Sequence, residues 1–403
     1  MASTLSWLDH DAHAADRSMR MLQLFKESEA RDEFGIGGIR DAIADQLFPG
    51  TSTLHTRLRY VFFLPWLYAQ MEEKHTSSLK YQDAGKQAEN LLLQMLLKSE
   101  PTATGIIGRS AGGDVKQLPS AVYWTALASW GIRHGNQTRQ QYFAQADLRH
   151  AHRSRRHRRY LNEDHLDDAP DANAAVWHPD IAKLRPPEFP EACSLALTSE
   201  EAGFLLDRWS ASQRDSLLTW LALDARRRPV VEQPAAIWQH PQLKEFPDRI
   251  QDLIVGGRKF NAALGGAALL YNLQLAELDG RAELVTEYEA KLVGWHEQER
   301  ADCADWKLDE FWPLVVGTGH TISEQTRRFV EDWRNAAVND IGSPAARQLI
   351  EQREIKLKGA RSRFTNRAVL KQWGGAAGTS PLAYRWPVAR ALLAEWHAGW
   401  SNK

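Results

Sequence analysis

The sequence predicts an all-α protein that contains at most a small sheet. Apolar residues recur at three- and four-residue spacings along most of the chain, whereas few segments alternate apolar and polar residues as a strand does. Glycine and proline separate these periodic stretches, as they commonly do between helices. The length of 403 residues is enough for two or three such helical domains.

Helical patterns occur throughout the first part of the chain. They cover Asp16–Glu27, Ile39–Phe48, Thr56–Met71 and Gln87–Leu97, and two further helices open at Pro119 and near Gln137. Thr56–Met71 is apolar on all sides, which indicates a buried helix, and Pro65 is expected to bend it. The last of these patterns becomes strongly basic and ends at Tyr160.

An acidic, proline-rich segment interrupts the helical pattern. Residues 162–197 show little periodicity, and we expect a linker or long surface loop there. The predicted domains are therefore residues 1–161, which end in the arginine-rich segment, and residues 198–403. The second begins at Thr198, which forms a capping box with Glu201. Its further helices are expected near 213–226, 248–278, 281–303, 323–338, 344–358 and 387–400.

The composition says more about the cellular compartment of the protein than about any reaction it could catalyse. Sixteen tryptophans are expected to anchor helices to one another, and the net charge of −1 argues neither for nor against nucleic acid. Cys193 and Cys303 form no CxxC pattern, which fits a reducing compartment. The N-terminal residues have no pattern of a secretory signal, and the apolar stretch at Ala262–Leu273 is too short for a membrane span. A cytoplasmic protein without membrane contact is expected.

No complete catalytic motif is present. The glycine-rich stretch Gly35–Ile39 precedes a helix and could turn its amides toward an anion, but it lacks the Walker lysine and the full dinucleotide spacing. A flexible entry to the helix is the alternative. The ligand-type side chains between Asp9 and His13 could hold a divalent ion, although such exposed clusters are usually solvated. We expect neither a metal nor a cofactor.

Two basic segments are the most informative feature of the sequence. Arg149–Arg159 contains six arginines and three histidines, and Arg353–Lys371 is broken by Gly359 into two helical parts. Such segments can neutralise phosphates, form a solvated or internally paired face, or dock a partner protein. The candidate nucleic-acid-binding residues are Arg149, Arg153, Arg155, Arg156, Arg158, Arg159, Lys356, Lys358, Arg361, Arg363 and Arg367.

Several stretches together resemble a known family. They are Ser6–Asp9, Arg31–Asp41, Leu47–Thr53, Thr56–Tyr60, and Gly359–Arg361 with the Trp373-Gly-Gly and Tyr384–Trp386 motifs. The combination resembles an uncharacterised bacterial family associated with antiphage defence islands, often near helicase and phospholipase D-like genes. The resemblance implies a defence setting, with a helicase or another defence protein as a possible partner, and it implies no mechanism.

Within these stretches, charged residues lie in otherwise apolar helices. Buried charges need partners, and Arg40 or Arg57 is expected to pair with Asp41 or Asp9. A pocket that holds a phosphate-containing ligand is the alternative to this structural network. The residues concerned are Asp9, Gly37, Gly38, Arg40, Asp41, Arg57, Arg59, Tyr384 and Arg385.

Three hypotheses about function follow. The first is a non-enzymatic component of a bacterial antiphage defence complex that contacts DNA or RNA or acts as a scaffold. The second is a nuclease or nucleotide-acting enzyme whose site is built from the N-terminal arginine, aspartate and glycine block. The third is a pure protein-interaction subunit in which the arginine-rich segment docks an acidic partner.

Overall fold

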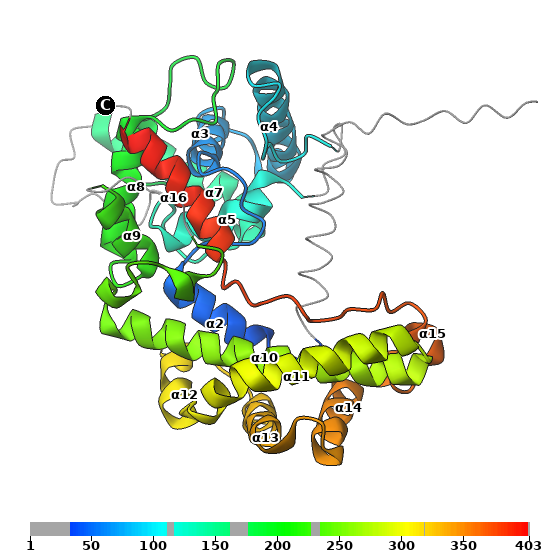
Figure 1. The fold of residues 1–403 in the computed structure, drawn as a ribbon. Helices are drawn as coiled ribbons and strands as arrows, with labels where there is room; N and C mark the ends of the chain where they lie inside the picture. The colour runs from blue at the N-terminus through cyan, green and yellow to red at the C-terminus, as the bar shows by residue number, and fades with distance from the viewer. Residues whose placement is uncertain (1–32, 111–116, 162–175, 227–233, 318, 402–403) are drawn as a thin grey trace, which may run out of the picture. The chain divides into compact units, whose positions relative to one another are not determined.

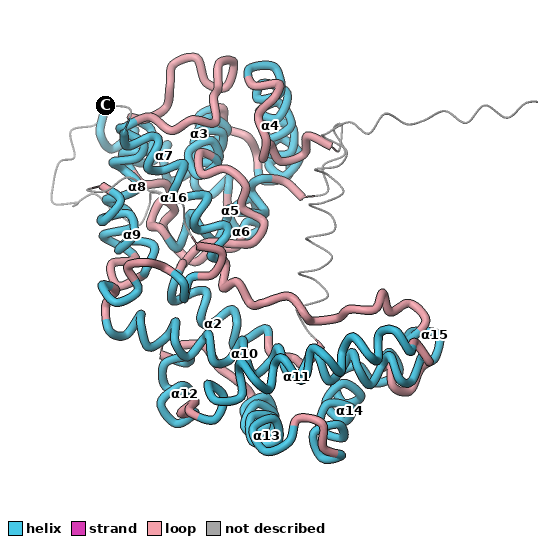
Figure 2. Tube along the Cα trace, in the orientation of Figure 1, coloured by secondary structure: helices cyan, strands magenta, loops and turns pink. Residues whose placement is uncertain are grey.

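The computed structural model confirms the all-α prediction. It describes residues 33–110, 117–161, 176–226, 234–317 and 319–401, with only the backbone for 156–161. Every regular element within these ranges is a helix. The one β-type pairing among them is an isolated bridge between Arg133 and Trp177. Figure 2 accordingly shows helices joined by loops.

The chain folds into two compact units that differ from the predicted domains. Unit 1 comprises Met1–Ala44 and Pro241–Tyr384, and unit 2 comprises Asp45–His240 and Arg385–Lys403. The C-terminal helix joins unit 2 because it packs on helices that follow residue 197. The described part of the predicted linker also belongs to unit 2, where Ile181, Phe189 and Leu195 are buried. Unit 2 therefore contains residues from both sides of the predicted boundary.

Unit 2 is organised around helix α3, Tyr60–Glu73. This helix is buried through most of its length and contains Pro65, in agreement with the buried helix predicted here. Thr198 and Glu201 form the predicted capping box at the start of α8. The remaining helices of unit 2 are α4 (Ser78–Ser99), α5 (Pro119–Ser129), α6 (Arg139–Ala144), α7 (Ala146–Leu161), α8 (Ser199–Ser212), α9 (Leu217–Ala225) and α16 (Trp386–Ser401), with the short η2 (Pro179–Ala182) and η3 (Ile237–Gln239).

Unit 1 is built on one long helix, α10, which spans Asp248–Asp279. Helix α11 (Ala282–Ala304) runs back along it, and α12 (Leu308–Val316), α13 (Glu324–Asp340) and α14 (Pro344–Lys358) pack against this pair (Figure 1). The short elements η4 (Leu243–Glu245), η5 (Gly359–Arg361) and α15 (Arg367–Leu370) complete it. Helix α2 (Gly37–Leu47) begins in unit 1, and its last three residues are assigned to unit 2.

Glycines in α10 explain how closely its neighbours approach. A Cβ atom at Gly266 would lie 2.8 Å from the ring of Trp295 on α11, and one at Gly256 would lie 2.8 Å from Phe311 on α12. Real Cβ atoms do not tolerate such distances, so the absence of a side chain permits these aromatic rings to reach the helix. The indole N–H of Trp295 then donates to the carbonyl of Ala262 at 2.7 Å. Tryptophan anchors between helices, as the sequence predicted, hold this unit together.

Two further predictions concern the N-terminal segment and the membrane. The helix predicted at 16–27 lies outside the described residues. Among the described residues, no helix combines the length and the apolar composition that crossing a bilayer requires.

Candidate nucleic-acid interface

The connection between α14 and α15 is a turn held by hydrogen bonds that side-chain oxygens accept. Gly359 follows α14 with φ +52°, a region that glycine adopts readily. The fully buried carboxylate of Glu354 accepts hydrogen bonds from the hydroxyl of Ser362 and the backbone N–H of Arg363. Asn366 caps α15 by accepting from two backbone N–H groups. These bonds fix the turn that carries the second basic segment.

Two of the predicted nucleic-acid-binding cations point inward from this turn. Lys358 and Arg363 both pair with the carboxylate of Glu33, and Arg363 Nη1 lies 2.8 Å from its Oε1. Arg363 also donates to the hydroxyl of Tyr271 at 3.0 Å. The Glu33 side chain is 6% exposed, and the two cations are 21% and 15% exposed. Both cations therefore have a structural partner before any ligand arrives.

Three other cations of the same segment point outward. Lys356, Arg361 and Arg367 are exposed. Within the part of the chain that the structure describes, none of the three has an ion pair. By contrast, the neighbouring Lys371 pairs with Asp279 at 2.7 Å. We call Lys356, Arg361 and Arg367 the outer cations.

The arginine-rich helix α7 is anchored in unit 2 by its first arginine. The guanidinium of Arg149 lies 3.8 Å from the ring centroid of Tyr142, and its Nε lies 3.2 Å from Glu72 Oε1. The Tyr142 hydroxyl donates to the same oxygen at 2.6 Å. Arg153 reaches the other oxygen of Glu72 at 2.5 Å, with 45% of its side chain exposed. Arg149 thus fastens α7 to the core. Arg153 pairs with the same carboxylate while nearly half of its side chain stays in contact with solvent.

The rest of the arginine-rich segment differs from these two residues. Arg155 is exposed and has no ion pair among the described residues. The backbone of Arg156, Arg158 and Arg159 continues α7, and their side chains lie outside the description, as does the acidic run at 162–175. Their role in binding nucleic acid therefore stays a prediction.

The arginines of the N-terminal block each have a carboxylate partner. Arg40 pairs with Asp41 at 2.8 Å, which is one of the pairings that the sequence left open. Arg57 pairs instead with Glu395 of α16 at 2.7 Å. These two pairs belong to different units, and each is part of its own unit's packing.

A buried ion pair holds α3 to α8. Arg59 donates through Nη2 to Glu201 Oε1 at 2.7 Å, and both side chains are less than 8% exposed. Burial raises the pKa of Glu201, while the hydrogen bond from Arg59 and its charge lower it. The capping glutamate of α8 therefore also neutralises a buried arginine, which gives Arg59 a structural role.

The remaining residues of the block are spread over several elements. Gly37 and Gly38 are the first residues of α2, and a Cβ atom at Gly38 would make only ordinary contact with Ile322 at 3.6 Å. Asp9 lies outside the described residues. The predicted ligand pocket of this block therefore lacks an observation to support it.

Tyr384 and Arg385 both adopt the left-handed backbone conformation, with φ of 47° and 61°. Tyr384 is buried in unit 1 and donates its hydroxyl to the carbonyl of Gly257 at 2.6 Å. Arg385, in unit 2, pairs with Asp45 and donates to the carbonyl of Thr51 at 2.9 Å. Each of these two strained residues is therefore held by contacts within its own unit.

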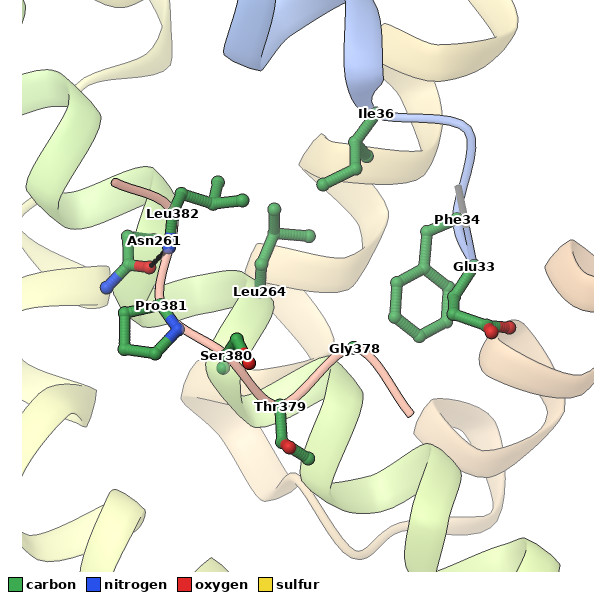
Figure 3. A pocket seen from close by; sticks show the side chains of 11 residues that line it. Glu33, Phe34, Ile36, Asn261, Leu264, Gly378, Thr379, Ser380, Pro381 and Leu382 are labelled. Atoms are coloured by element: carbon green, nitrogen blue, oxygen red, sulfur yellow. Dashed lines mark hydrogen bonds between the residues drawn. The ribbon is translucent and has the colours of Figure 1, made fainter. Parts of the chain in front are cut away.

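Unit 1 also contains a pocket. Figure 3 shows apolar side chains around it, with the hydroxyls of Thr379 and Ser380 at one side and the carboxylate of Glu33 directed away. It holds about 520 Å³ of non-protein space, part of which is open to solvent. It is lined by Glu33, Phe34, Ile36, Asn261, Leu264, Gly265, Gly378, Thr379, Ser380, Pro381 and Leu382. Such walls suit a small apolar group, and Arg40 and Asp41 are not among them.

Residues 2–399 match a family of unknown function, DUF6361. The chain belongs to this family. The match covers nearly the whole chain, as the resemblance at both ends of the sequence indicated. Membership in DUF6361 carries no activity with it, and the association with defence islands stays a prediction. Neither the comparison with curated proteins nor that with solved structures gave a match.

Sequence reasoning missed the acidic partners in this DUF6361 chain. Glu33 lies 330 residues from Arg363, and Glu72 lies 81 residues from Arg153. Nothing in the local sequence distinguishes these glutamates from the chain's other acidic residues. Which arginines face a carboxylate could be found only from the tertiary structure.

Proposed function

We propose that this protein is a non-enzymatic component of a bacterial antiphage defence complex that contacts DNA or RNA, or serves there as a scaffold. The observation that supports the proposal is the set of outer cations. Lys356, Arg361 and Arg367 are exposed and lack an anionic partner among the described residues. They lie at the end of α14, in the α14–α15 turn and at the start of α15, and the buried Glu354 holds this turn in place.

The physical basis is phosphate neutralisation. An unpaired exposed cation gives up no ion pair when it contacts a phosphate, whereas Lys358 and Arg363 would have to leave Glu33. A fixed backbone also lowers the entropic cost of presenting several cations together. Each phosphate contact releases counterions, which makes the affinity fall steeply as the salt concentration rises.

Helix α7 is proposed as a second contact surface. Arg155 resembles the outer cations in being exposed and without an ion pair among the described residues. We do not include Arg149 in this surface, because its guanidinium lies over the ring of Tyr142 and contacts Glu72. The contribution of Arg156, Arg158 and Arg159 is proposed from the sequence alone.

The defence setting and a helicase as partner rest on the family resemblance. The enzyme hypothesis receives less support, because Arg40, Arg57 and Arg59 are already paired with carboxylates. The protein-interaction hypothesis uses the same exposed cations and is separated from nucleic-acid binding by experiment.

The test is fluorescence anisotropy with labelled single- and double-stranded DNA and RNA over a series of salt concentrations. A triple variant, Lys356→Ala with Arg361→Ala and Arg367→Ala, should bind more weakly. For duplex DNA, the slope of log affinity against log salt should become shallower by roughly 0.9 for each phosphate that the variant no longer neutralises. The control, Lys80→Ala with Lys86→Ala and Lys98→Ala, changes the net charge equally through exposed lysines of α4.

Equal weakening by both triple variants would show that only the overall charge matters and would contradict the assigned surface. Failure of the wild-type protein to bind at low salt would overturn the nucleic-acid contact altogether. In that case, a complex with a neighbouring helicase that survives nuclease treatment would favour the interaction subunit.

A further inference from the structure

Two histidine rings face each other on the surface of unit 2. His75 follows the C-terminus of α3, and His150 lies in the first turns of α7. Their Nδ1 atoms are 2.6 Å apart, and their ring centroids are 3.7 Å apart. Two nitrogens at this distance can share only one proton between them, and two imidazolium rings would repel each other. The arrangement therefore requires at least one ring to be neutral and to offer a lone pair.

The backbone on both sides holds the rings in this position. His75 has φ +56°, a conformation that is uncommon for residues with a side chain and that turns the chain from α3 toward α4. The carboxylate of Asp147, one turn before His150, accepts from the backbone N–H and the hydroxyl of Ser78. The start of α4 is thereby tied to the start of α7. The two histidines meet across this junction.

We propose that His75 and His150 form a binding site for a divalent transition-metal ion, with both Nδ1 atoms as ligands. Metal–imidazole bonds of about 2.0–2.1 Å at tetrahedral or square angles place two nitrogens roughly 2.9–3.4 Å apart. Each ring reaches solvent, so its side chain can rotate. This rotation must widen the gap between the nitrogens and move the ring centroids from 3.7 Å to roughly 4.5–5.2 Å apart, so that both lone pairs point at one ion. The ring that now carries its proton on Nδ1 adopts the Nε2–H tautomer, which leaves both Nδ1 lone pairs free.

The chemistry favours borderline ions such as Zn²⁺, Ni²⁺ and Cu²⁺, for which imidazole is a preferred ligand. Hydrogen bonds from Ser78 lower the pKa of Asp147, whose negative charge lies near His150 and favours a bound cation. Among the described residues, no three metal-ligating side chains come together, so the site has two protein ligands and water as the others. A bound ion would fasten the arginine-rich helix to the α3–α4 turn. This inference does not depend on the proposed function.

The experiment uses the full chain without a histidine tag. Zn²⁺ binding is measured by isothermal titration calorimetry, and Cu²⁺ binding by electron paramagnetic resonance, in which coordinated imidazole nitrogens split the signal. The variants are His75→Asn and His150→Gln. Asparagine tolerates the left-handed backbone conformation, so the first variant removes the imidazole without adding strain. The control is His152→Gln, which removes an exposed imidazole of the same helix.

The proposal predicts one saturable ion per chain and a signal from two nitrogens. Loss of a hydrogen bond to a ligand already weakens metal binding by about 10- to 100-fold, so each ligand variant should weaken it at least that much. His152→Gln should leave binding unchanged. The proposal is overturned if the wild-type protein shows no saturable binding, or if the ligand variants bind as the control does. A Tm raised by Zn²⁺ in the control and not in the folded ligand variants provides an independent check.

Discussion

The two basic segments have similar compositions and different architectures. In α7, the described arginines near the start of the helix turn toward one carboxylate, that of Glu72, and Arg149 also lies over the rings of Tyr81 and Tyr142. In the α14–α15 turn, the cations divide into an inner pair bound to Glu33 and the exposed outer cations. The inner cations fix the structure, and the outer ones remain available to a ligand.

This difference shows why the number of arginines in a segment does not measure its capacity to bind phosphate. A cation with a buried partner must break that pair before it can contact a ligand, which offsets the gain. A cation without a partner has no such cost. The following predictions test whether the carboxylates at Glu33 and Glu72 are the structural centres of their segments.

The largest effect is expected for Glu33→Gln. This change leaves Lys358 and Arg363 mostly buried. Lys358 keeps its 3.5 Å ion pair with Glu354, and Arg363 keeps only a neutral partner, the hydroxyl of Tyr271 at 3.0 Å. Removing one partner from a buried pair costs about 3–5 kcal/mol, and the partial exposure of both cations places this case near 3 kcal/mol. Urea unfolding followed by tryptophan fluorescence measures the change.

The matched control is Glu324→Gln, which breaks an exposed pair with Arg328 whose side chains are 69% and 71% exposed. It should cost no more than about 0.5 kcal/mol. Equal costs for the two substitutions would show that Glu33 is not the centre of the inner network.

Acid should weaken unit 2 through His55. This ring stacks on Tyr123 with centroids 4.2 Å apart, and its Nε2 lies 3.2 Å from the carbonyl of Val122. Burial lowers its pKa from 6.5 to about 4. The unfolded chain therefore takes up a proton at a higher pH than the folded chain does. The stability that His55 contributes is complete above about pH 6.5 and is lost as the pH falls toward 4, a total of about 3 kcal/mol.

The measurement compares the free energy of unfolding at pH 7.5 and near pH 4.5 for the wild type and His55→Gln. Glutamine keeps a donor for Val122 and does not titrate, so the variant should lose less stability on acidification. Other titrating groups in unit 2, such as Glu89 and Glu201, remain in both proteins and cancel in the comparison. The control is His296→Gln on the exposed surface of unit 1. If the wild type loses no more free energy of unfolding on acidification than His55→Gln does, His55 is not the group responsible for the loss.

Local sequence signals predicted most of the fold. The range predicted at 344–358 coincides with α14, the capping box at Thr198 is present, and the apolar helix around Pro65 is buried. Each of these depends on residues within one or two helical turns. The two units could not be predicted in this way, because α16 joins unit 2 through contacts with α8 and α9 that are far away in the sequence.

At the candidate site, too, contacts between residues far apart in the sequence could not be predicted. The sequence identified both basic segments and Gly359, which are local features. It could not separate Arg361, which is exposed, from Arg363, which is paired, because their division depends on Glu33 at the other end of the chain. A charge pattern indicates where cations are concentrated, and only tertiary contacts determine which of them are free.

A smaller effect is expected for Glu72→Gln in α3. The hydroxyl of Tyr142 can still donate to the amide oxygen, whereas Arg149 loses its ion pair in a site that is 11% exposed. Arg153 is 45% exposed and is screened by solvent. The cost should be about 1–2 kcal/mol in urea unfolding, below that of Glu33→Gln. Glu73→Gln, which breaks only an exposed 3.4 Å contact with Arg185, is the adjacent control. If Glu72→Gln lowers the free energy of unfolding more than Glu33→Gln does, Glu72 and not Glu33 is the more important structural centre.

The smallest change in stability is expected for single exposed cations. Arg155→Ala in α7 and Lys356→Ala in α14 should each alter the free energy of unfolding by less than about 0.5 kcal/mol, because neither residue has an ion pair among the described residues. Their effects on duplex DNA binding provide a second comparison between the two segments.

Each substitution should reduce the slope of log affinity against log salt by about 1 if its segment contacts phosphate. A reduction for Lys356→Ala alone would assign the contact to the α14–α15 turn, and one for Arg155→Ala alone would assign it to α7. Arg149→Ala cannot make this distinction, because it removes the anchor of α7 together with a positive charge.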